Sequence, residues 1–195
     1  FKLHRLEKNI NSNKILLIDA NEKSKSFEKL DKVIRKILAI NFKKNHRMIV
    51  IGGGITQDIG SFISSIIFRG VEWIFIPTSF LSQCDSCIGG KTSINFFGKK
   101  NQIGNFNPPS LIYIDTKFLT SLSSLDISSG VGEMAHYFLV NSKDDFNFFR
   151  KFYEKALIND QKACFKLIFR SLSIKKKFIE KDEFDKKERL ILNYG

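Results

Sequence analysis

The chain has 195 residues, 43% of them hydrophobic and 27% charged, which is typical of a folded protein with a sizeable core rather than a disordered or fibrous one. No apolar run approaches the roughly 18 residues that a membrane-spanning helix needs, so we expect no membrane partner. The formal net charge is +12, but 25 of the 32 basic residues are Lys and the excess lies in residues 1–50 and 141–195, a pattern typical of solvated helices, so we expect no nucleic-acid partner.

The first predicted elements are a strand and an amphipathic helix. Residues 15–19 (ILLID) form a short apolar run that is typical of a buried strand. Apolar residues then recur at helical spacing from Phe27 to Leu38, and Ser24 or Ser26 can cap the start of this helix.

Three further apolar runs predict strands at residues 48–51 (MIVI), 73–76 (WIFI) and 111–114 (LIYI). A helix is expected between the first two, from about Asp58 to Arg69, ended by Gly70. Strands that alternate with helices in this way predict an α/β fold with a mainly parallel sheet.

The pattern becomes wholly helical from about Ser123. The apolar residues of the Phe-rich segment 146–152 recur at helix-like spacing. We therefore expect two domains, an α/β domain over residues 1–122 and a helical domain over residues 123–195.

A run of three glycines, residues 52–54, joins a predicted strand to a predicted helix. Glycines at such a turn let the backbone approach a pyrophosphate, whose charge the helix N-terminus stabilises. The G-x-G-x-x-G fingerprint is incomplete, because its third glycine would fall at Gln57, so a simple tight turn explains the run nearly as well. Asp58 is either the N-cap of the helix or a ligand for a ribose hydroxyl.

A second glycine-rich turn, residues 89–92 (GGKT), resembles the end of a P-loop. A P-loop needs a glycine six residues before its lysine, and that position is Asp85, so the P-loop interpretation fails. What remains is a group of polar residues around turns, which either binds a small anionic molecule or forms a solvated loop: Asp85, Lys91, Lys99, Lys100 and Asn101.

Two short motifs suggest redox or metal chemistry. Cys84-x-x-Cys87 has no second pair, since Cys164 is far away in the sequence, so we expect small buried thiols in a reducing compartment. Glu133-x-x-His136 places both side chains on one helix face, as in metal-carboxylate bundles, but an ordinary amphipathic helix produces this spacing equally well.

Taken together, an ordered series of motifs resembles the 3-dehydroquinate synthases, a family of sugar phosphate cyclases. The motifs are residues 52–62 (GGGITQDIGSF), 69–95 (RGVEWIFIPTSFLSQCDSCIGGKTSIN), 98–106 (GKKNQIGNF), 114–119 (IDTKFL), 129–139 (SGVGEMAHYFL) and 174–195 (IKKKFIEKDEFDKKERLILNYG). Iron-dependent alcohol dehydrogenases share the nucleotide-domain architecture, but residues 77–92 are similar to the synthase branch.

The resemblance implies a Rossmann-like NAD-binding α/β domain, followed by the start of an all-α metal-binding domain. It also implies a cytoplasmic carbon–oxygen lyase of the shikimate pathway, in aromatic amino acid biosynthesis. Such an enzyme uses NAD and a divalent metal, zinc or cobalt, to convert a small-molecule substrate, a heptulosonate 7-phosphate, to 3-dehydroquinate with release of phosphate.

The same resemblance also implies functions for individual residues. Those matched to cofactor binding are Ala20, Asn21, Glu22, Lys23, Ser24, Lys25, Gly54, Ile55, Thr56, Gln57, Asp58, Thr78, Ser79, Lys91, Lys100, Phe118, Leu119, Thr120 and Ser121. Those matched to the substrate or to catalysis are Asp85, Lys91, Lys100, Asn101, Lys175, Arg189, Asn193 and Arg69. Glu133 matches the carboxylate metal ligand. Arg69 matches an arginine that reaches the phosphate site of a neighbouring subunit, which implies a homodimer.

The chain departs from the family pattern in two ways, and both change what we expect of its activity. The family has a lysine that holds the substrate phosphate where this chain has His136. Two metal-binding histidines of the family would follow Gly195, so we expect a fragment of roughly half a family chain, without the N-terminal strands and with little or no activity by itself. The alternatives are another sugar phosphate cyclase, from a secondary-metabolite or polysaccharide pathway, and a non-catalytic nucleotide-binding module.

Overall fold

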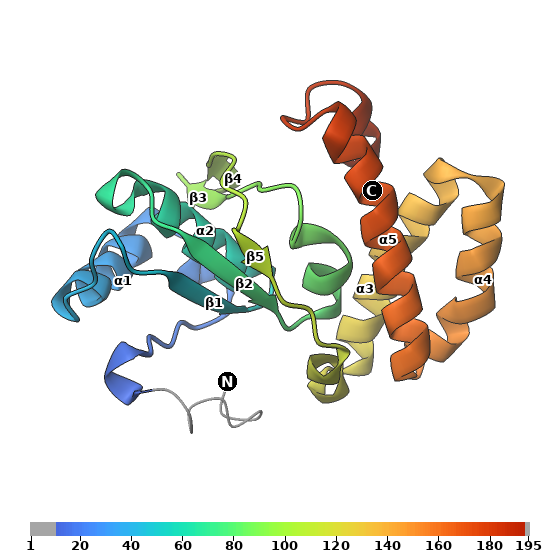
Figure 1. Ribbon diagram of the computed structural model, residues 1–195, viewed down its shortest axis with the longest axis horizontal. Helices are drawn as coiled ribbons and strands as arrows, with labels where there is room; N and C mark the ends of the chain where they lie inside the picture. Colours follow the sequence, from blue (N-terminus) through green and yellow to red (C-terminus); the bar gives the residue numbers. More distant parts are fainter. Residues whose placement is uncertain (1–10, 194–195) are drawn as a thin grey trace. The chain divides into compact units, whose positions relative to one another are not determined.

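The computed structural model describes residues 11–193 (Figure 1). Contacts divide the chain into two compact units that are not continuous in sequence. Among the described residues, unit 1 contains residues 11–76 together with Gly90–Tyr113, and unit 2 contains Pro77–Gly89 and residues 114–193. Within residues 11–193, no helix is both long and apolar enough to cross a membrane.

Unit 1 is built on a three-stranded sheet with the order β1 (Met48–Gly52), β2 (Trp73–Pro77), β5 (Leu111–Ile112). β2 and β5 run parallel, with Ile74 opposite Leu111. The predicted parallel α/β fold is therefore confirmed, and each of its three strands starts at the predicted residue.

Two helices accompany this sheet, α1 (Phe27–Ala39) and α2 (Gly54–Ile66). Their buried apolar faces share one core with residues that follow α2 and with the first residue of β3: Leu30, Ile37, Ile59, Phe62, Ile63, Ile67, Val71 and Ile94. A 3₁₀ turn, Ile67–Arg69, follows α2 and ends at Gly70, which adopts a φ of 107°, so glycine stops this helical segment as predicted.

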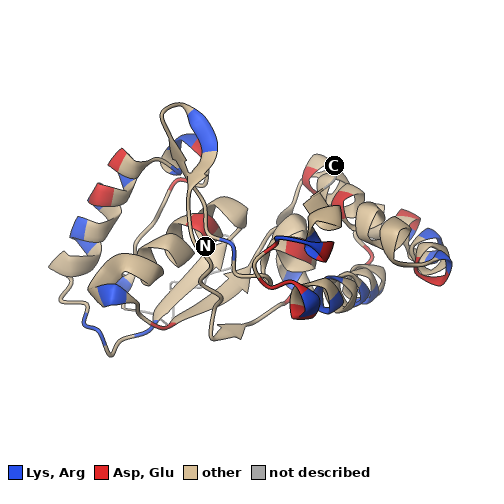
Figure 2. Ribbon diagram, turned by 90° about the horizontal axis from the view of Figure 1, so that it is seen from above, with Lys and Arg blue, Asp and Glu red and all other residues tan. Residues whose placement is uncertain are grey.

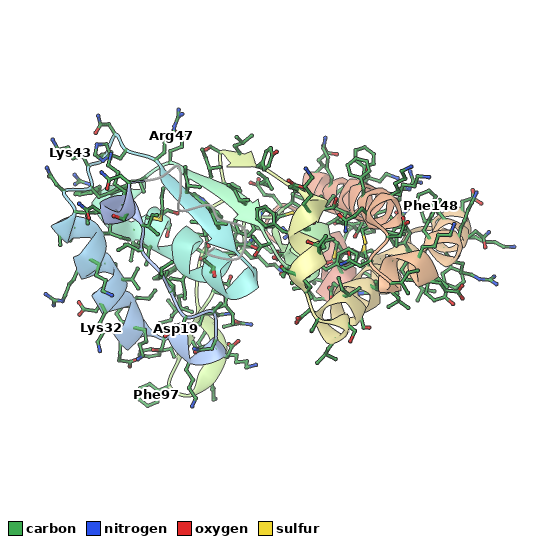
Figure 3. The ribbon with its side chains drawn as sticks, turned by 90° about the horizontal axis from the view of Figure 1, so that it is seen from below. Asp19, Lys32, Lys43, Arg47, Phe97 and Phe148 are labelled. Atoms are coloured by element: carbon green, nitrogen blue, oxygen red, sulfur yellow. The ribbon has the colours of Figure 1, made fainter. Side chains whose placement is uncertain are left out.

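An antiparallel hairpin, β3 (Ile94–Phe96) and β4 (Lys99–Ile103), forms a separate two-stranded sheet in unit 1. Its two-residue turn places Phe97 and Gly98 at positive φ, 53° and 71°. The Phe97 side chain is 91% exposed and projects from the tip of the hairpin (Figure 3). The sequence analysis did not predict this hairpin.

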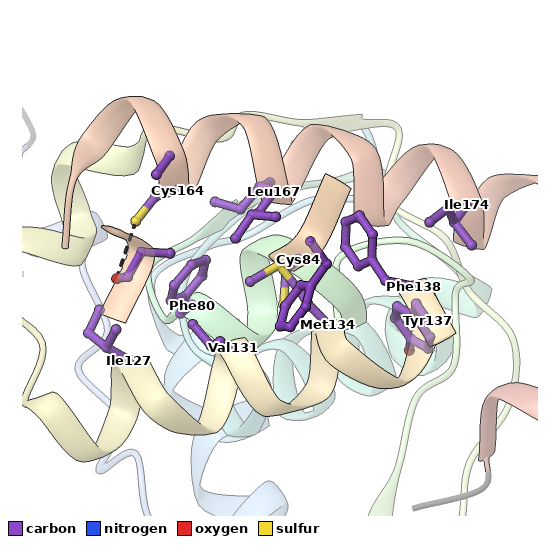
Figure 4. Close-up of a cluster of buried hydrophobic side chains, with 14 of the residues drawn as sticks. Phe80, Cys84, Ile127, Val131, Met134, Tyr137, Phe138, Cys164, Leu167 and Ile174 are labelled. Carbon is purple, nitrogen blue, oxygen red and sulfur yellow. Dashed lines mark hydrogen bonds between the residues drawn. The ribbon is translucent and has the colours of Figure 1, made fainter. Parts of the chain in front are cut away.

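Unit 2 contains three long helices, α3 (Ser124–Asn141), α4 (Lys143–Leu157) and α5 (Gln161–Lys181). Ser123 caps α3 in a capping box with Asp126, so the predicted helical start near residue 123 is confirmed. The buried faces of these helices meet around Leu167, Met134 and Phe138 (Figure 4). The three cysteines are buried free thiols, as predicted, and Cys84 lies in this core.

Two local predictions are wrong. Residues 15–19 are not a strand, because an apolar run becomes a strand only where a neighbouring strand pairs with it. α2 begins at Gly54 rather than near Asp58, so that the glycine-rich segment forms its first turn. Glycine disfavours a helix interior, but the first N–H groups of a helix have no intrahelical partner and need no strong helix former.

The positive charge is not concentrated on one segment. Figure 2 shows Lys and Arg interspersed with Asp and Glu on the helices. In α1, for example, Arg35 pairs with Asp31 one turn before it, and both side chains are exposed. This distribution is typical of solvated helix faces.

Candidate functional site

The strand-to-helix turn of unit 1 has the geometry of an anion site. β1 ends at Gly52, Gly53 is the N-cap of α2, and Gly54 opens the helix. A Cβ atom added at Gly54 would meet no atom within 4 Å, so the approach to the helix N-terminus is open. The unpaired N–H groups and the dipole of such a terminus favour a phosphate group.

Gly60 supplies the close packing that the incomplete fingerprint seemed to lack. A Cβ atom at Gly60 would come within 2.5 Å of the Val50 side chain, so α2 packs directly on β1 at this point. In the dinucleotide-binding fingerprint the third glycine serves this contact between helix and strand. Such packing fits both interpretations of residues 52–54, so their role in phosphate binding stays a prediction.

Beside this turn, Lys25 is buried and joins two other predicted site residues. Its Nζ atom lies 2.7 Å from Asp58 Oδ2 and 2.8 Å from Asn101 Oδ1. Burial raises the pKa of the Asp58 carboxyl, and the ion pair with Lys25 opposes that rise. Three residues that are 33 and 76 positions apart along the chain thus form one polar cluster.

Glu22 extends this cluster. Its Oε1 atom accepts a hydrogen bond of 2.7 Å from Asn95 Nδ2, which lowers the pKa of Glu22, with smaller contributions from the charges of Lys25 and Lys100. Asn95 is not among the predicted site residues, and the sequence carried no signal for it beyond its position in the matched motif 69–95. We call the five residues Glu22, Lys25, Asp58, Asn95 and Asn101 the lysine cluster.

The other predicted residues of unit 1 differ in burial. Asn21 caps the short turn Glu22–Ser24, where its side chain accepts a hydrogen bond from Ser24 N. Gln57 is buried and Ile55 is half-buried against the core. The remaining predicted residues of this unit are half-buried or exposed: Ala20, Lys23, Thr56, Arg69, Lys91 and Lys100.

Unit 2 contains a second cluster, which joins Asp85, Lys175 and Tyr137. Asp85 lies in the π-helical turn Ser82–Ser86, and Lys175 lies on α5. The Lys175 ammonium group pairs with the Asp85 carboxylate and also donates to the Asp85 carbonyl oxygen at 2.9 Å. The Tyr137 hydroxyl donates to the same carboxylate.

Tyr137 also lies 3.4 Å from Glu133 Oε1, one helical turn away on α3. The structure therefore brings the predicted metal ligand, Glu133, to the predicted substrate residues Asp85 and Lys175. Sequence reasoning missed Tyr137, although its i+4 spacing from Glu133 puts the two on one face. We call Asp85, Glu133, Tyr137 and Lys175 the carboxylate cluster.

The electrostatics of the carboxylate cluster raise the pKa of two of its groups, Glu133 and Tyr137. Burial and the neighbouring Asp85 carboxylate raise the pKa of Glu133, and Lys175 and His136 oppose that rise. Burial and the same Asp85 carboxylate raise the pKa of the Tyr137 hydroxyl far above its usual range. Tyr137 therefore keeps its proton and acts as a hydrogen-bond donor at neutral pH.

Arg189 is held by the segment that follows α5. The Asp182 carboxylate accepts backbone hydrogen bonds from Lys186, Lys187 and Arg189. The Arg189 guanidinium group is buried and donates to the carbonyl oxygens of Glu183 and Gly89.

The lack of a side chain at Gly89 makes room for the Arg189 guanidinium group. A Cβ atom at Gly89 would lie 2.2 Å from Arg189 Nη2, and its φ is 99°. Asn193, the last described residue, donates to the Asp185 side chain at 2.7 Å. Arg189 and Asn193, which the sequence predicted as substrate contacts, thus both belong to the segment after α5.

The remaining predicted cofactor residues of unit 2 lie in two turns. Ser79 Oγ and Ser82 Oγ are 2.9 Å apart, and Thr78, next to Ser79, is half-buried. The predicted stretch 118–121 belongs to the 3₁₀ turn Thr116–Ser121, in which Phe118 and Leu119 are buried while Thr120 and Ser121 bond to backbone carbonyls. Their role in nucleotide binding stays a prediction.

The described chain provides one predicted metal ligand. Among residues 11–193, no group of three or more His, Cys, Asp or Glu side chains is arranged to hold a metal ion. The Glu133 carboxylate is a suitable oxygen ligand for zinc or cobalt, but such sites need at least two more protein ligands. His136 Nε2 lies 3.1 Å from the Ile191 carbonyl oxygen.

Comparison with known proteins relates the chain to one group of enzymes. The model of the 3-dehydroquinate synthase N-terminal region matches residues 15–129, and the model of the C-terminal region matches residues 130–195. The 3-dehydroquinate synthase of Streptococcus pyogenes is 39% identical over 172 residues, which are 88% of this chain and 47% of that protein. The chain thus spans about half the length of such curated relatives.

Solved structures of two sugar phosphate cyclases share the fold. A 2-epi-5-epi-valiolone synthase from Streptomyces hygroscopicus subsp. jinggangensis, with NAD⁺ and Zn²⁺ bound, has a TM-score of 0.84 and 25% identity, covering 91% of this chain and 50% of that chain. A 2-deoxy-scyllo-inosose synthase, complexed with carbaglucose-6-phosphate, NAD⁺ and Co²⁺, has a TM-score of 0.86 and 25% identity, covering 92% and 49%.

Proposed function

Because the chain belongs to the 3-dehydroquinate synthase family, we propose that it forms part of an enzyme that converts a heptulosonate 7-phosphate to 3-dehydroquinate and releases phosphate. The observation that carries this proposal is the carboxylate cluster. Three residues that the resemblance assigned to the metal and the substrate, Asp85, Glu133 and Lys175, lie together in unit 2 although they come from three separate elements.

NAD and a divalent metal, zinc or cobalt, are the proposed cofactors, supported by the ions and nucleotide bound in the solved relatives. NAD would supply a transient hydride acceptor for a substrate hydroxyl. The open N-terminus of α2 at Gly54 would bind its pyrophosphate, and Glu22 and Asp58 of the lysine cluster would bind hydroxyl groups nearby.

The carboxylate cluster would handle the substrate. Lys175 is a buried cation that would attract an anionic substrate group, and Tyr137 would donate a hydrogen bond from a hydroxyl that keeps its proton. Glu133 would be a metal ligand. Arg189, seated by Gly89 and Asp182, would bind a carboxylate.

A second candidate is another sugar phosphate cyclase, with a substrate that lacks the carboxylate. One residue favours it, His136, which stands where the family has a phosphate-binding lysine. The two solved relatives, which are named for other cyclase products, also show that this fold serves several substrates. Lys175, Arg189 and Asn193 match the family's substrate contacts and favour the first proposal.

A phosphate-release assay on the complete gene product that contains this chain tests the proposal. We expect phosphate release from the heptulosonate phosphate in the presence of NAD, and loss of that release after treatment with a chelator. Release only from a sugar phosphate without a carboxylate would replace the first proposal by the second. Absence of release from either class of substrate would overturn both.

We also propose that the enzyme is a cytoplasmic homodimer. The three free thiols fit a reducing compartment, and Arg69 is exposed, as a residue must be to reach a partner subunit. Sedimentation of the complete gene product tests the second point. A monomer at working concentration would contradict it.

A further inference from the structure

Asn95, in β3, uses both ends of its side-chain amide to join residues of the lysine cluster. Its Nδ2 atom donates to Glu22 Oε1 at 2.7 Å, and its Oδ1 atom accepts from the backbone N–H of Asn101 at 3.0 Å. The partners fix the orientation of the amide, because an ionised carboxylate only accepts and an N–H only donates. The backbone N–H of Asn95 also donates to the Lys25 carbonyl oxygen at 2.8 Å.

Asn101 depends on these bonds for its conformation. It lies in β4 with a φ of 57°, a left-handed conformation that residues other than glycine adopt at a cost. Three contacts outside its own peptide stabilise it: its N–H donates to Asn95, and its Oδ1 atom accepts from Lys25 Nζ at 2.8 Å and from Ser93 Oγ at 2.5 Å. Loss of Asn95 would remove the one that holds the Asn101 backbone N–H.

We propose that Asn95 is a positioning residue that couples the cofactor side of the site to the substrate side. This inference rests on the proposed function, in which Glu22 and Lys25 bind the nucleotide and Asn101 contacts the substrate. Asn95 contacts each of these three residues from one position in the hairpin. It therefore sets the distance between the nucleotide-binding segment and the substrate-binding strand.

The coupling requires an amide and not only a side chain of this size. Aspartate is nearly isosteric with asparagine, but it cannot donate to Glu22, and its charge would face the Glu22 carboxylate at hydrogen-bond distance. Alanine would remove both bonds without adding a charge. The substitutions Asn95→Asp and Asn95→Ala therefore separate the loss of a bond from the addition of a repulsion.

The experiment measures NAD binding by calorimetry and substrate KM at saturating NAD, in the complete gene product. Removal of a hydrogen bond to a charged group should weaken NAD binding about 10-fold or more in Asn95→Ala, and further in Asn95→Asp. Substrate KM should rise in both variants with kcat nearly unchanged, because Asn101 binds the substrate in the ground and transition states alike. Gln102→Ala is the matched control, since this exposed amide of the same hairpin donates to the Lys100 carbonyl oxygen and, among residues 11–193, contacts neither Glu22 nor Asn101 through a hydrogen bond.

A double variant that exchanges the amide and the carboxylate between positions 95 and 22 keeps the test informative if Asn95→Asp alone folds poorly. Combining Asn95→Asp with Glu22→Gln lets the new amide donate to the new carboxylate while the bond to Asn101 N–H is kept. We expect substrate KM to return toward the parent value in this double variant. A merely structural role would lower the active fraction, and so kcat, but leave KM and the NAD Kd unchanged.

The coupling role of Asn95 and the proposed function would be overturned by two different results. Parent-like Kd and KM values in both single variants would overturn the coupling while leaving the proposed function intact. Failure of the parent protein to bind NAD would overturn the proposed function itself.

Discussion

The Lys175 ammonium group contacts Asp85 twice, through an ion pair with its carboxylate and through a hydrogen bond of 2.9 Å to its carbonyl oxygen. The two residues are 90 positions apart in sequence, and both side chains are largely buried. The contact therefore fixes the π-helical turn against α5 and places two opposite charges in the interior of unit 2 at the same time.

Replacement of Lys175 by methionine should cost both stability and activity. The change leaves the Asp85 carboxylate buried without its cation, and breaking a buried pair in this way costs roughly 3–5 kcal/mol. Urea denaturation followed by circular dichroism measures the loss. The double variant with Asp85→Asn should recover much of it, and an equal loss in single and double variants would contradict a pairing role.

Gly60→Ala should destabilise the protein, and Gly132→Ala should not. The added methyl group at Gly60 would lie 2.5 Å from the Val50 side chain, an overlap that costs about 1–3 kcal/mol. Gly132, within α3, has nothing within 4 Å of its Cβ position, so alanine there should gain about 0.5–1 kcal/mol from helix propensity. Thermal melting of the two variants should shift in opposite directions, and parallel shifts would refute the close packing of α2 on β1.

Lowering the pH should weaken the hydrogen bonds of the segment that holds Arg189 and so lower the stability of the protein. Backbone hydrogen bonds, that of Lys186 first, lower the pKa of Asp182, so its contribution to stability is complete above the unfolded value near 3.9 and is lost as the pH falls below it. Asp182→Asn should therefore weaken stability at neutral pH and flatten the acid limb of the stability curve below about pH 4. Glu180→Gln, an exposed change on α5, is the control and should leave that limb unchanged.

The thiols should react only when the protein unfolds. Burial raises the pKa of Cys87 to about 12 and that of Cys164 to about 11, and Cys84 is shifted upward as well. At pH 8 we expect a colourimetric thiol reagent to label none of the three in native buffer and all three in urea. Rapid native labelling of Cys84 and Cys87 would instead support a redox pair.

His136→Lys should improve phosphate handling. A lysine would restore the permanent positive charge that the family pattern has at this position, and a hydrogen bond to a charged group is worth roughly 10-fold in affinity. Substrate KM in the phosphate-release assay should fall accordingly. His136→Ala is the comparison, and equal KM values for the two variants would show that residue 136 does not contact the phosphate.

Local patterns predicted most of the elements, and long-range pairing limited the rest. The helical spacing of apolar residues was sufficient to predict α1, and a continuous apolar run was sufficient to predict β1, because both patterns lie within a short stretch of sequence. It failed for residues 15–19 and for the β3–β4 hairpin, because strand formation depends on a partner segment and Phe97 occupies a turn position that usually takes Asn or Gly.

The candidate site shows the same limit. The glycine-rich start of α2 was found from sequence, but Glu133, Asp85 and Lys175 were connected only through resemblance to a family. Their contacts span up to 90 positions, and no spacing rule reaches that far. Tyr137 and Asn95 were missed for a related reason: each matters through the partners it contacts, and those partners are visible only in three dimensions.

Because the two units are discontinuous in sequence, they determine the order in which parts of the chain can fold during synthesis. The chain passes from one unit to the other after Ile76, after Gly89 and after Tyr113. Unit 1 is complete only when residue 113 has left the ribosome, and the segment Pro77–Gly89, which carries Asp85, must then wait for α3 and α5 before it can be buried. Until α3 and α5 are made, Phe80 and Cys84 lack the helices that bury them, so we expect this stretch of the newly made chain to be prone to aggregation.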